Sequence, residues 1–249
     1  LRFISFNSWI IIINVVVFLA DIALSGHAVP VVIDVQPPTL AMQKLKAEPI
    51  FRDSMGTPLP EMVPLFVRDR RGNIYPDPEG RTRPNPALKS GGIAYVRLGN
   101  GTSTEVLGTA KVAFMPPLAA YGHFSTQKGF RGLEMWRYIT FQFLHGGVSH
   151  LFFNMFGLWI FGGMVEQYLG FKRYAAFYLT CGVFGAVSYL LLNLLGAGLG
   201  LQLPGVLFDS LFTPLVGASA GVFGVIMACA YIAPNAIVQL LFPPVPLKL

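Results

Sequence analysis

Hydrophobic residues gather in long runs that are interrupted by one extended polar stretch. Three runs, at about residues 149–168, 174–197 and 214–231, have the length and composition of helices that cross a lipid bilayer. An earlier run at residues 9–24 is slightly short for such a helix and also fits the apolar core of a signal peptide. The pattern predicts a polytopic helical bundle whose membrane part is all-α.

The end of the sequence contains another apolar run. A further span is predicted to begin near Ala236, and the prolines at 243, 244 and 246 favour a loop or a helix start over the last residues. The sequence starts at Leu1 and stops inside this run. We therefore expect it to be a piece of a longer protein.

The polar stretch, residues 26–137, is rich in proline, glycine and short strand-like segments. Residues 64–68 and 74–75 predict one β-hairpin, and residues 93–98 with a return near Val106 predict a second. We therefore expect a β-rich insert between a first span and a helical core. The predicted domains are the first span at residues 1–25, the insert at 26–137, and the core at 138–249 with spans two to four and the start of span five.

Composition excludes an ordinary soluble protein. Only 12% of the 249 residues are charged and 53% are hydrophobic, with a mean hydropathy of +0.57, whereas a soluble domain carries about 25% charged residues. Residues 26–137 hold 14 of the 18 basic residues and 9 of the 12 acidic ones. Because both signs are interspersed there, the net charge of +6 indicates a solvated surface rather than a nucleic-acid interface.

The basic residues of the short loops predict the orientation. With the N-terminus in the cytoplasm, Arg2, Lys172, Arg173 and Lys248 all lie on the cytoplasmic side, as the positive-inside rule requires. The insert then becomes an extracytoplasmic loop. This agreement also favours a first run that is retained as a membrane span.

A few polar side chains lie inside the predicted spans, where they are costly and therefore typical of functional sites. His150 and Asn154 are four residues apart, so they share one helix face. Ser219 lies about five residues, or roughly 7–8 Å, from the outer end of its span, at a similar depth. A hydroxyl, an imidazole and a carboxamide at one level predict nucleophilic catalysis, in which a base activates the serine and donors stabilise the oxyanion.

Each of these residues also has a structural interpretation. Gly217 and Gly221 belong to a face of small residues on which helices pack closely, and a serine there often bonds its own backbone. His150 alone fits an interfacial residue, and Glu166 fits a structural hydrogen-bonding group. Depth alone would favour His150 as the base. A transporter or channel with Asp21 and Glu166 on its path is a third hypothesis.

Four short stretches follow one another in the second half of the chain: Trp136-Arg137; His145, His150 and Asn154 in HGGVSHLFFN; Gly162-x-x-x-Glu166-x-x-x-Gly170; and Gly217-Ala218-Ser219-Ala220. Together, and in this order, they resemble motifs of the rhomboid family of intramembrane serine proteases. The resemblance covers about residues 130–235 and includes a plausible first span. A single G-x-S-x is a weak signal, but four stretches in order within this topology are specific.

The resemblance implies a rhomboid-like bundle of six helical spans, about four of them present in these residues, that cleaves transmembrane protein substrates with a Ser-His dyad. Ser219 would be the nucleophile, and His150, Asn154 and the Ser219 backbone N–H would form the oxyanion hole. The family's base histidine lies on the sixth span, which these 249 residues do not contain. The resemblance therefore implies that this histidine, and not His150, is the base.

Other expectations also come from the resemblance. Gly217 would let the backbone approach the substrate, and Phe223 would flank the base. The supporting residues would be Trp136, Arg137, His145 and Glu166. No cofactor and no metal is implied. The expected partners are transmembrane protein substrates and the lipid bilayer of a bacterial inner membrane, with no nucleic acid. The alternative is a catalytically inactive rhomboid-like pseudoprotease that binds membrane client proteins.

Overall fold

The computed structural model describes the backbone of residues 5–36, 106–200 and 209–234 and of shorter segments at residues 62–64, 66–68, 74–76, 82–84, 93–99, 203, 207, 237–239 and 246–248. Side chains are described for residues 5–35, 111–200, 203, 207 and 209–234. All structural statements below concern these residues.

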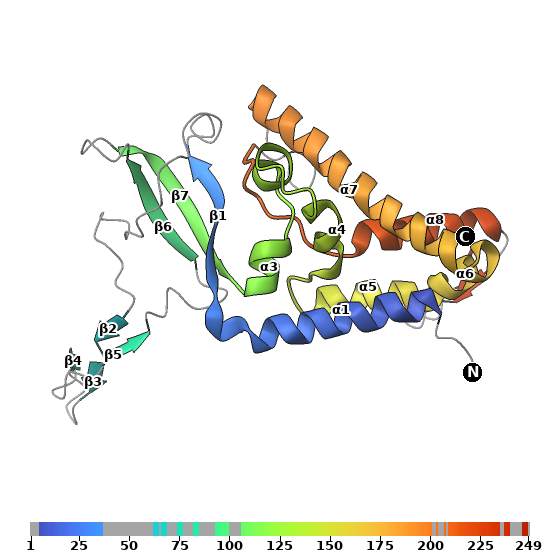
Figure 1. The fold of residues 1–249 in the computed structure, drawn as a ribbon, viewed down its shortest axis with the longest axis horizontal. Coiled ribbons are helices and arrows are strands. Elements are labelled where there is room, and N and C mark those ends of the chain that lie inside the picture. Colours follow the sequence, from blue (N-terminus) through green and yellow to red (C-terminus); the bar gives the residue numbers. More distant parts are fainter. Residues whose placement is uncertain are drawn as a thin grey trace.

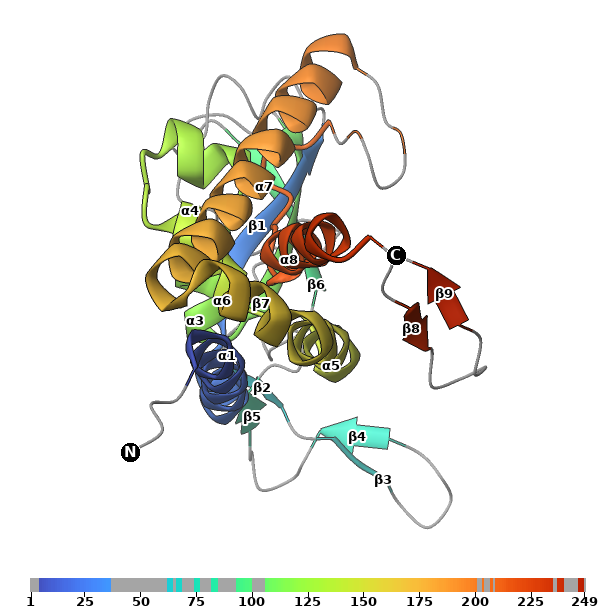
Figure 2. The same ribbon diagram turned by 90° about the vertical axis from the view of Figure 1, so that its right-hand side faces the viewer.

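Apolar helices lie side by side and form the body of the molecule (Figures 1 and 2). They are α1 (Phe6–Ala23), α5 (Val148–Gly157), a π-helical segment (Leu158–Gly162), α6 (Gly163–Leu169), α7 (Phe171–Leu199) and α8 (Ser219–Ile232). Within the described residues, three continuous helical stretches are long and apolar enough to cross a membrane: Phe6–Ala23, Val148–Leu169 and Phe171–Leu199. Helix α8 is also apolar but shorter. The chain is thus a helical membrane bundle, as its hydrophobic pattern predicts.

The fourth predicted span differs from the structure at its start. A helix was expected from Pro214, but α8 begins at Ser219. Gly217 has φ +129°, which a right-handed helix does not allow. Ser219 is therefore the first residue of its helix, and the predicted five residues of helix before it are absent.

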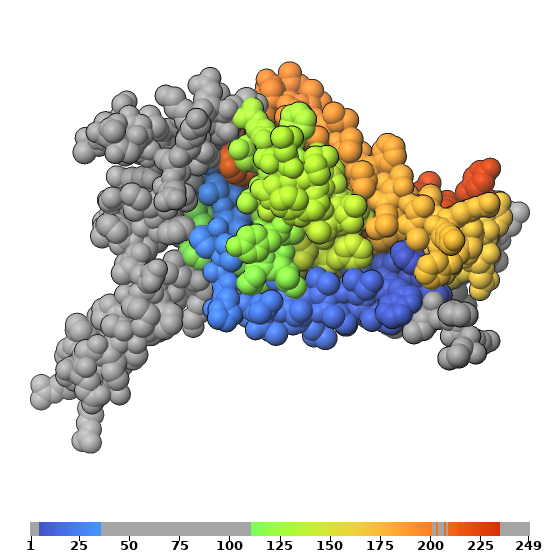
Figure 3. Space-filling model, in the orientation of Figure 1, coloured from blue at the N-terminus to red at the C-terminus, as the bar shows by residue number. Residues whose placement is uncertain are grey.

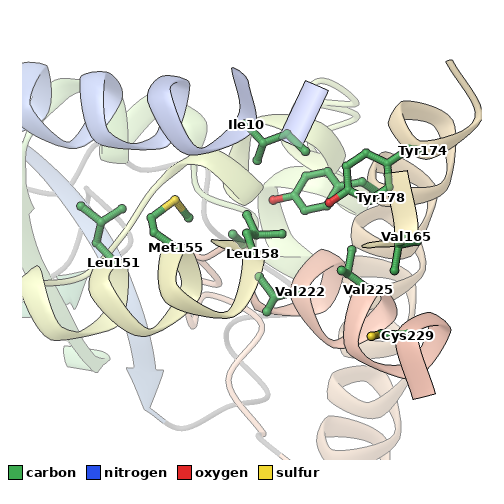
Figure 4. Packing of buried hydrophobic residues seen from close by; sticks show 11 residues of the cluster. Ile10, Leu151, Met155, Leu158, Val165, Tyr174, Tyr178, Val222, Val225 and Cys229 are labelled. Atoms are coloured by element: carbon green, nitrogen blue, oxygen red, sulfur yellow. The ribbon is translucent and has the colours of Figure 1, made fainter. Parts of the chain in front are cut away.

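Eleven residues form the hydrophobic core where α1, α5, α6, α7 and α8 converge (Figure 4): Ile10, Leu151, Met155, Leu158, Val165, Tyr174, Tyr178, Ala218, Val222, Val225 and Cys229. Small residues let α7 and α8 approach closely. A Cβ placed on Gly221 would collide with the Tyr178 ring, and Gly224 packs in the same way against Cys181. The interpretation of this stretch as a packing face is therefore right for Gly221, and Gly224 packs against α7 as well.

The insert contains a three-stranded antiparallel sheet in the order β1-β7-β6, built from β1 (Val29–Gln36), β7 (Val106–Met115) and β6 (Ile93–Gly99). The predicted hairpin of β6 with β7 is confirmed, whereas β1 was not predicted. The other predicted hairpin is also present, as β3 (Phe66–Arg68) paired with β4 (Ile74–Pro76). A further pair joins β2 (Met62–Pro64) to β5 (Thr82–Pro84).

The sheet is joined to the helical body at the end of α1. Strand β1 follows α1 after one short turn (Ser25–His27), and β7 leads directly into α3 (Pro117–Gly122). The Asp21 carboxylate accepts hydrogen bonds from the backbone N–H groups of Leu118 (3.0 Å) and Ala119 (3.3 Å). One acid at the end of α1 thus fixes the start of α3, which explains its presence in an apolar helix.

The β-rich part of the insert ends at Met115. The residues after it form α3, a π-helical turn (Thr126–Arg131), α4 (Arg137–Thr140) and a 3₁₀ turn (Phe141–Phe143). This segment covers one side of the helical body above α1 (Figure 3). Phe124 and Phe141 form a second core with Ala186 and Leu190 of α7.

The expectation of a helical span beginning near Ala236 is wrong for the described residues. There the chain forms two short antiparallel strands, β8 (Ile237–Gln239) and β9 (Pro246–Lys248). The physical reason is the local composition, because Ile237 and Val238 are β-branched and nearby prolines cannot donate helical hydrogen bonds.

Candidate active site

Ser219 lies at the N-terminus of α8, with a half-buried side chain. The first N–H groups of a helix have no intrahelical acceptor, and the helix dipole makes this end electropositive. Ala218, the residue before it, is completely buried. The serine hydroxyl is therefore placed where a developing negative charge is stabilised.

Residues 210–217, here called the strap, lead to the start of α8 and are bonded on two sides. On the α7 side, Tyr189 Oη donates to the Thr213 carbonyl at 2.9 Å, and Asn193 Nδ2 donates to the Ser210 carbonyl at 3.0 Å. Tyr189 and Asn193 are one helical turn apart, so a single face of α7 holds the strap.

On its other side the strap pairs with the backbone of the segment after α3. Phe124 and Leu215 exchange two N–H to carbonyl hydrogen bonds of 3.0 and 2.7 Å. The Gly217 N–H donates to the Phe141 carbonyl at 2.9 Å. Because the strap is bonded from both sides, the position of the chain is fixed immediately before Ser219.

Gly217 brings the histidine of α5 next to the serine of α8. A Cβ built on Gly217 would lie 2.7 Å from both Cε1 and Nε2 of His150, and 3.8 Å from Oγ of Ser219. A larger residue would push the imidazole away, and φ +129° is a conformation for which glycine is suited. The His150 ring and the Ser219 hydroxyl thus both approach the space that a side chain at position 217 would occupy.

Asn154 lies one turn after His150 and is buried. Its Nδ2 donates to the His150 carbonyl at 3.1 Å. The structure therefore brings His150 and Ser219 together, while the Asn154 amide is bonded to the backbone of its own helix.

His145 stands beside His150, with ring centroids 5.1 Å apart in an edge-to-face arrangement. Both of its ring nitrogens are buried and have no hydrogen-bond partner among the described residues. Burial, and secondarily the charge of His150, lowers the pKa of His145 to about 4. The imidazole is therefore neutral at physiological pH.

Arg137 and Trp136 support the segment that pairs with the strap. The Arg137 side chain is only 1% exposed. Its Nε donates to Glu134 Oε2 at 2.6 Å, and its Nη1 donates to the carbonyls of His123 (2.6 Å) and Ala120 (3.3 Å). Trp136 Nε1 donates to the carbonyl of Tyr121 at 3.3 Å. Both side chains bind backbone carbonyls, which is a structural role.

Glu166 acts at the opposite end of the bundle. Its two carboxylate oxygens accept the backbone N–H groups of Phe6 (2.7 Å) and Asn7 (2.9 Å), which are free at the start of α1. Asn7 Nδ2 donates to the Leu158 carbonyl at 2.9 Å, and Tyr174 Oη donates to Asn7 Oδ1 at 2.8 Å. Glu166 and Asp21, the acids of the transporter hypothesis, both bind the N–H groups of helix starts.

The remaining expected residue, Phe223, lies one turn after Ser219 and is 67% exposed.

No group of three or more His, Cys, Asp or Glu side chains that could hold a metal ion occurs within the described part of the chain.

Comparison with known proteins agrees with the motifs. Residues 132–249 match the family model of the Rhomboid domain. The C-terminal part of the chain thus contains a Rhomboid domain. Together with its apolar helices, this makes the chain an integral multi-pass membrane protein. No solved structure gives a significant match.

Several curated rhomboid proteins are similar over short segments. The chain is 41% identical over 70 residues to RHOMBOID-like protein 6, mitochondrial, of Arabidopsis thaliana, covering 28% of this chain and 23% of that protein. It is 31% identical over 102 residues to Rhomboid protease GluP of Bacillus subtilis, covering 40% and 16%. It is 39% identical over 54 residues to Inactive RHOMBOID-like protein 8 of Arabidopsis thaliana, covering 22% and 15%. The chain thus spans less than a quarter of the length of each of these rhomboid relatives.

The sequence pattern did not single out Tyr189 and Asn193, which hold the strap. The available signal was a pair of polar residues at i and i+4 in an otherwise apolar helix, which is the spacing that led to His150 and Asn154.

Proposed function

We propose that the full-length protein is an intramembrane serine endopeptidase that cleaves transmembrane protein substrates, with Ser219 as its nucleophile. The observation that carries this proposal is the position of Ser219 at the start of α8, beside His150 across Gly217. A nucleophile at a helix N-terminus with an imidazole next to it is suited to acyl transfer. The protease names of rhomboid relatives such as GluP agree with this assignment.

In the proposed reaction, Ser219 Oγ attacks the scissile carbonyl carbon and passes its proton to a general base. The carbonyl oxygen becomes an oxyanion, which accepts hydrogen bonds from the Ser219 N–H and the His150 imidazole. Asn154 joins them when its amide leaves the His150 carbonyl. The base then gives the proton to the leaving amine, and water hydrolyses the acyl-enzyme. The base is proposed to be a histidine on a further span, flanked by Phe223.

Replacement of Ser219 by alanine tests the proposal in the full-length protein. Ser219→Ala should abolish cleavage of a transmembrane test substrate in liposomes, because it removes the hydroxyl that forms the acyl-enzyme in the proposed reaction. Ser188→Ala, at an exposed position of α7, is the matched control and should cleave like the native protein. Labelling by a serine-reactive fluorophosphonate should disappear only in Ser219→Ala. Cleavage that survives in Ser219→Ala would overturn the proposal.

The second candidate is a rhomboid-like protein that binds membrane clients without cutting them. One similar protein is named as inactive, and the Asn154 amide is bonded to its own helix. This candidate predicts that the native full-length protein and Ser219→Ala bind a transmembrane client equally and that neither cleaves it.

We also propose a membrane and an orientation for the chain. The N-terminus would lie in the cytoplasm and the insert outside it, in a bacterial inner membrane, because Arg2, Lys172, Arg173 and Lys248 then all face the cytoplasm. A cysteine at Gly26, which is exposed after α1, should react with an impermeant maleimide added from outside. Reaction only from the inside would reverse the orientation.

A further inference from the structure

A pocket of about 530 Å³ lies where the insert meets the helical body. The last turns of α1 contribute Phe18 and Ile22 to its walls, and the end of β7 contributes Ala113 and Met115. The remaining walls come from the start of α5, with Val148, and from the strap, with Val216. The insert thus supplies one wall of a cavity whose other walls belong to the rhomboid body.

The pocket adjoins the candidate active site. Val216 directly precedes Gly217, and Val148 opens the helix that carries His150. His145 also lines the pocket, and its ring lies 5.1 Å from the ring of His150. An extended peptide held at Ser219 therefore reaches the pocket within a few residues, since each residue of such a chain spans about 3.3 Å.

The chemistry of the lining favours an apolar group with a peptide group beside it. Most lining residues are aliphatic or aromatic, and the Asp21 carboxylate is bonded to the N–H groups of α3. The ring nitrogens of His145 are buried and have no partner among the described residues. Buried polar atoms in proteins are generally hydrogen-bonded, so these nitrogens indicate where a bound group is recognised.

The wall formed by the insert is held in place. Strand β7 pairs with β1 along its length, and Val31, Val112 and Phe114 are almost completely buried. The start of α3, which follows β7, is bonded to Asp21 of α1. A side chain that enters the pocket therefore meets a fixed surface, which is the condition for discrimination by size.

We propose that the insert completes a substrate-recognition pocket, in which Ala113 and Met115 of β7 select an apolar side chain of the substrate and His145 binds the adjacent peptide group. The proposal rests on the endopeptidase function above. It assigns the insert to substrate selection rather than to an independent domain.

Substrate series in the full-length protein test this pocket. Each position around the scissile bond is varied from alanine through valine and leucine to phenylalanine, and kcat/KM is measured in liposomes. The native protein should prefer a large apolar residue at one position by about 10-fold or more. Ala113→Phe fills the pocket and should shift that preference from the large apolar residue to alanine. Ala176→Phe, the same change at an exposed position of α7, should leave the preference unchanged.

Three further variants keep the test decisive if Ala113→Phe does not fold. Met115→Ala enlarges the pocket and should increase the preference for phenylalanine over leucine. His145→Leu should weaken binding of every substrate by about 2- to 10-fold, the value of one neutral hydrogen bond, and His145→Gln should restore part of it. A native preference at no position, or a preference that Ala113→Phe and Met115→Ala leave unchanged, would overturn the proposal.

Binding measurements distinguish a failure of the pocket proposal from a failure of the proposed protease function. The same peptides are titrated against Ser219→Ala, and their dissociation constants are measured by fluorescence anisotropy. If the native protein cleaves nothing but the peptides bind with the side-chain preference that Ala113→Phe reverses, the pocket stands and the protease function fails. If cleavage depends on Ser219 but neither binding nor cleavage responds to Ala113→Phe and Met115→Ala, the protease function stands and the pocket fails.

Discussion

Two polar sites lie at opposite ends of the same helical bundle, and they differ in how their polar atoms are paired. In the Glu166 site, formed by Glu166, Asn7 and Tyr174, carboxylate, amide and phenol are all hydrogen-bonded within the protein. In the Ser219 site, formed by Ser219, His150 and His145, the His145 nitrogens are buried without partners among the described residues. The first arrangement stabilises a fold, and the second leaves groups available for a ligand.

The comparison shows that polarity inside a span does not by itself indicate function. The presence of the Glu166 carboxylate in a membrane span is explained by the two hydrogen bonds that it accepts from backbone N–H groups. The His150 imidazole, which lies beside Gly217 and His145, has no side-chain hydrogen bond among the described residues that would account for it in the same way. The two sites should therefore respond differently to substitution, one in stability and the other in turnover.

The largest effect is expected from His150→Ala at the Ser219 site, which should lower turnover without lowering stability. In the proposed mechanism His150 is an oxyanion donor, so His150→Ala should lower kcat by about 10²–10³-fold. The thermal unfolding midpoint should change little, because the ring makes no hydrogen bond that holds the fold together within the described residues. His27→Ala, at an exposed position after α1, is the control. Equal losses of folded protein and of kcat would make the Ser219 site a structural one.

The Glu166 site should behave in the opposite way. Glu166→Ala leaves two N–H groups at the start of α1 without their acceptor, so the free energy of unfolding in detergent should fall by about 1.5–3 kcal/mol. Activity per folded molecule should stay near the native value. Glu166→Gln keeps one acceptor oxygen and should lose less stability. A drop in kcat of the folded fraction would contradict the contrast between the two sites.

A smaller effect is expected where α7 holds the strap. Tyr189→Phe removes the hydrogen bond to the Thr213 carbonyl, which is worth about 1 kcal/mol. If that bond positions Ser219, kcat should fall several-fold while KM stays constant, and Tyr168→Phe, at an exposed position of α6, should change neither. A change in KM alone would place the role of Tyr189 in substrate binding instead.

The smallest effect concerns pH. Burial lowers the pKa of His145 to about 4, whereas an unfolded histidine titrates near 6.5. Between these values the unfolded state binds more protons, so the stability contributed above pH 6.5 is lost as the pH falls through this window. The acid-side slope of unfolding free energy should be shallower in His145→Gln than in the native protein. Ser188→Ala, at an exposed position that does not titrate, should keep the native slope. An unchanged slope in His145→Gln would contradict the burial of this imidazole.

The sequence predicts the parts of this molecule that depend on local pattern. Apolar runs place α1, α5 to α6 and α7, and turn residues place the β6–β7 and β3–β4 hairpins. Strand β1 was missed because its partner β7 lies about seventy residues away, and no turn signal joins them. The start of α8 was misplaced because the strap takes its hydrogen bonds from Phe124, Phe141 and α7, which an apolar pattern does not reveal.

The candidate site was predictable to a similar degree. Spacing and depth suggested that His150 and Ser219 meet, and the structure places both beside Gly217. The pairing of the Asn154 amide with its own helix was not predictable, because sequence spacing places the amide on a helix face but does not say which acceptor it binds.

A carboxylate connects each end of helix α1 to a neighbouring element. Glu166 accepts hydrogen bonds from the N–H groups of its first residues, and its own Asp21 accepts hydrogen bonds from the N–H groups at the start of α3. It is 18 residues long, about 27 Å at 1.5 Å per residue. A rod pinned in this way transmits force along its axis. Tension applied to the sheet is therefore carried along α1 to its Glu166 end, on the other side of the helical bundle.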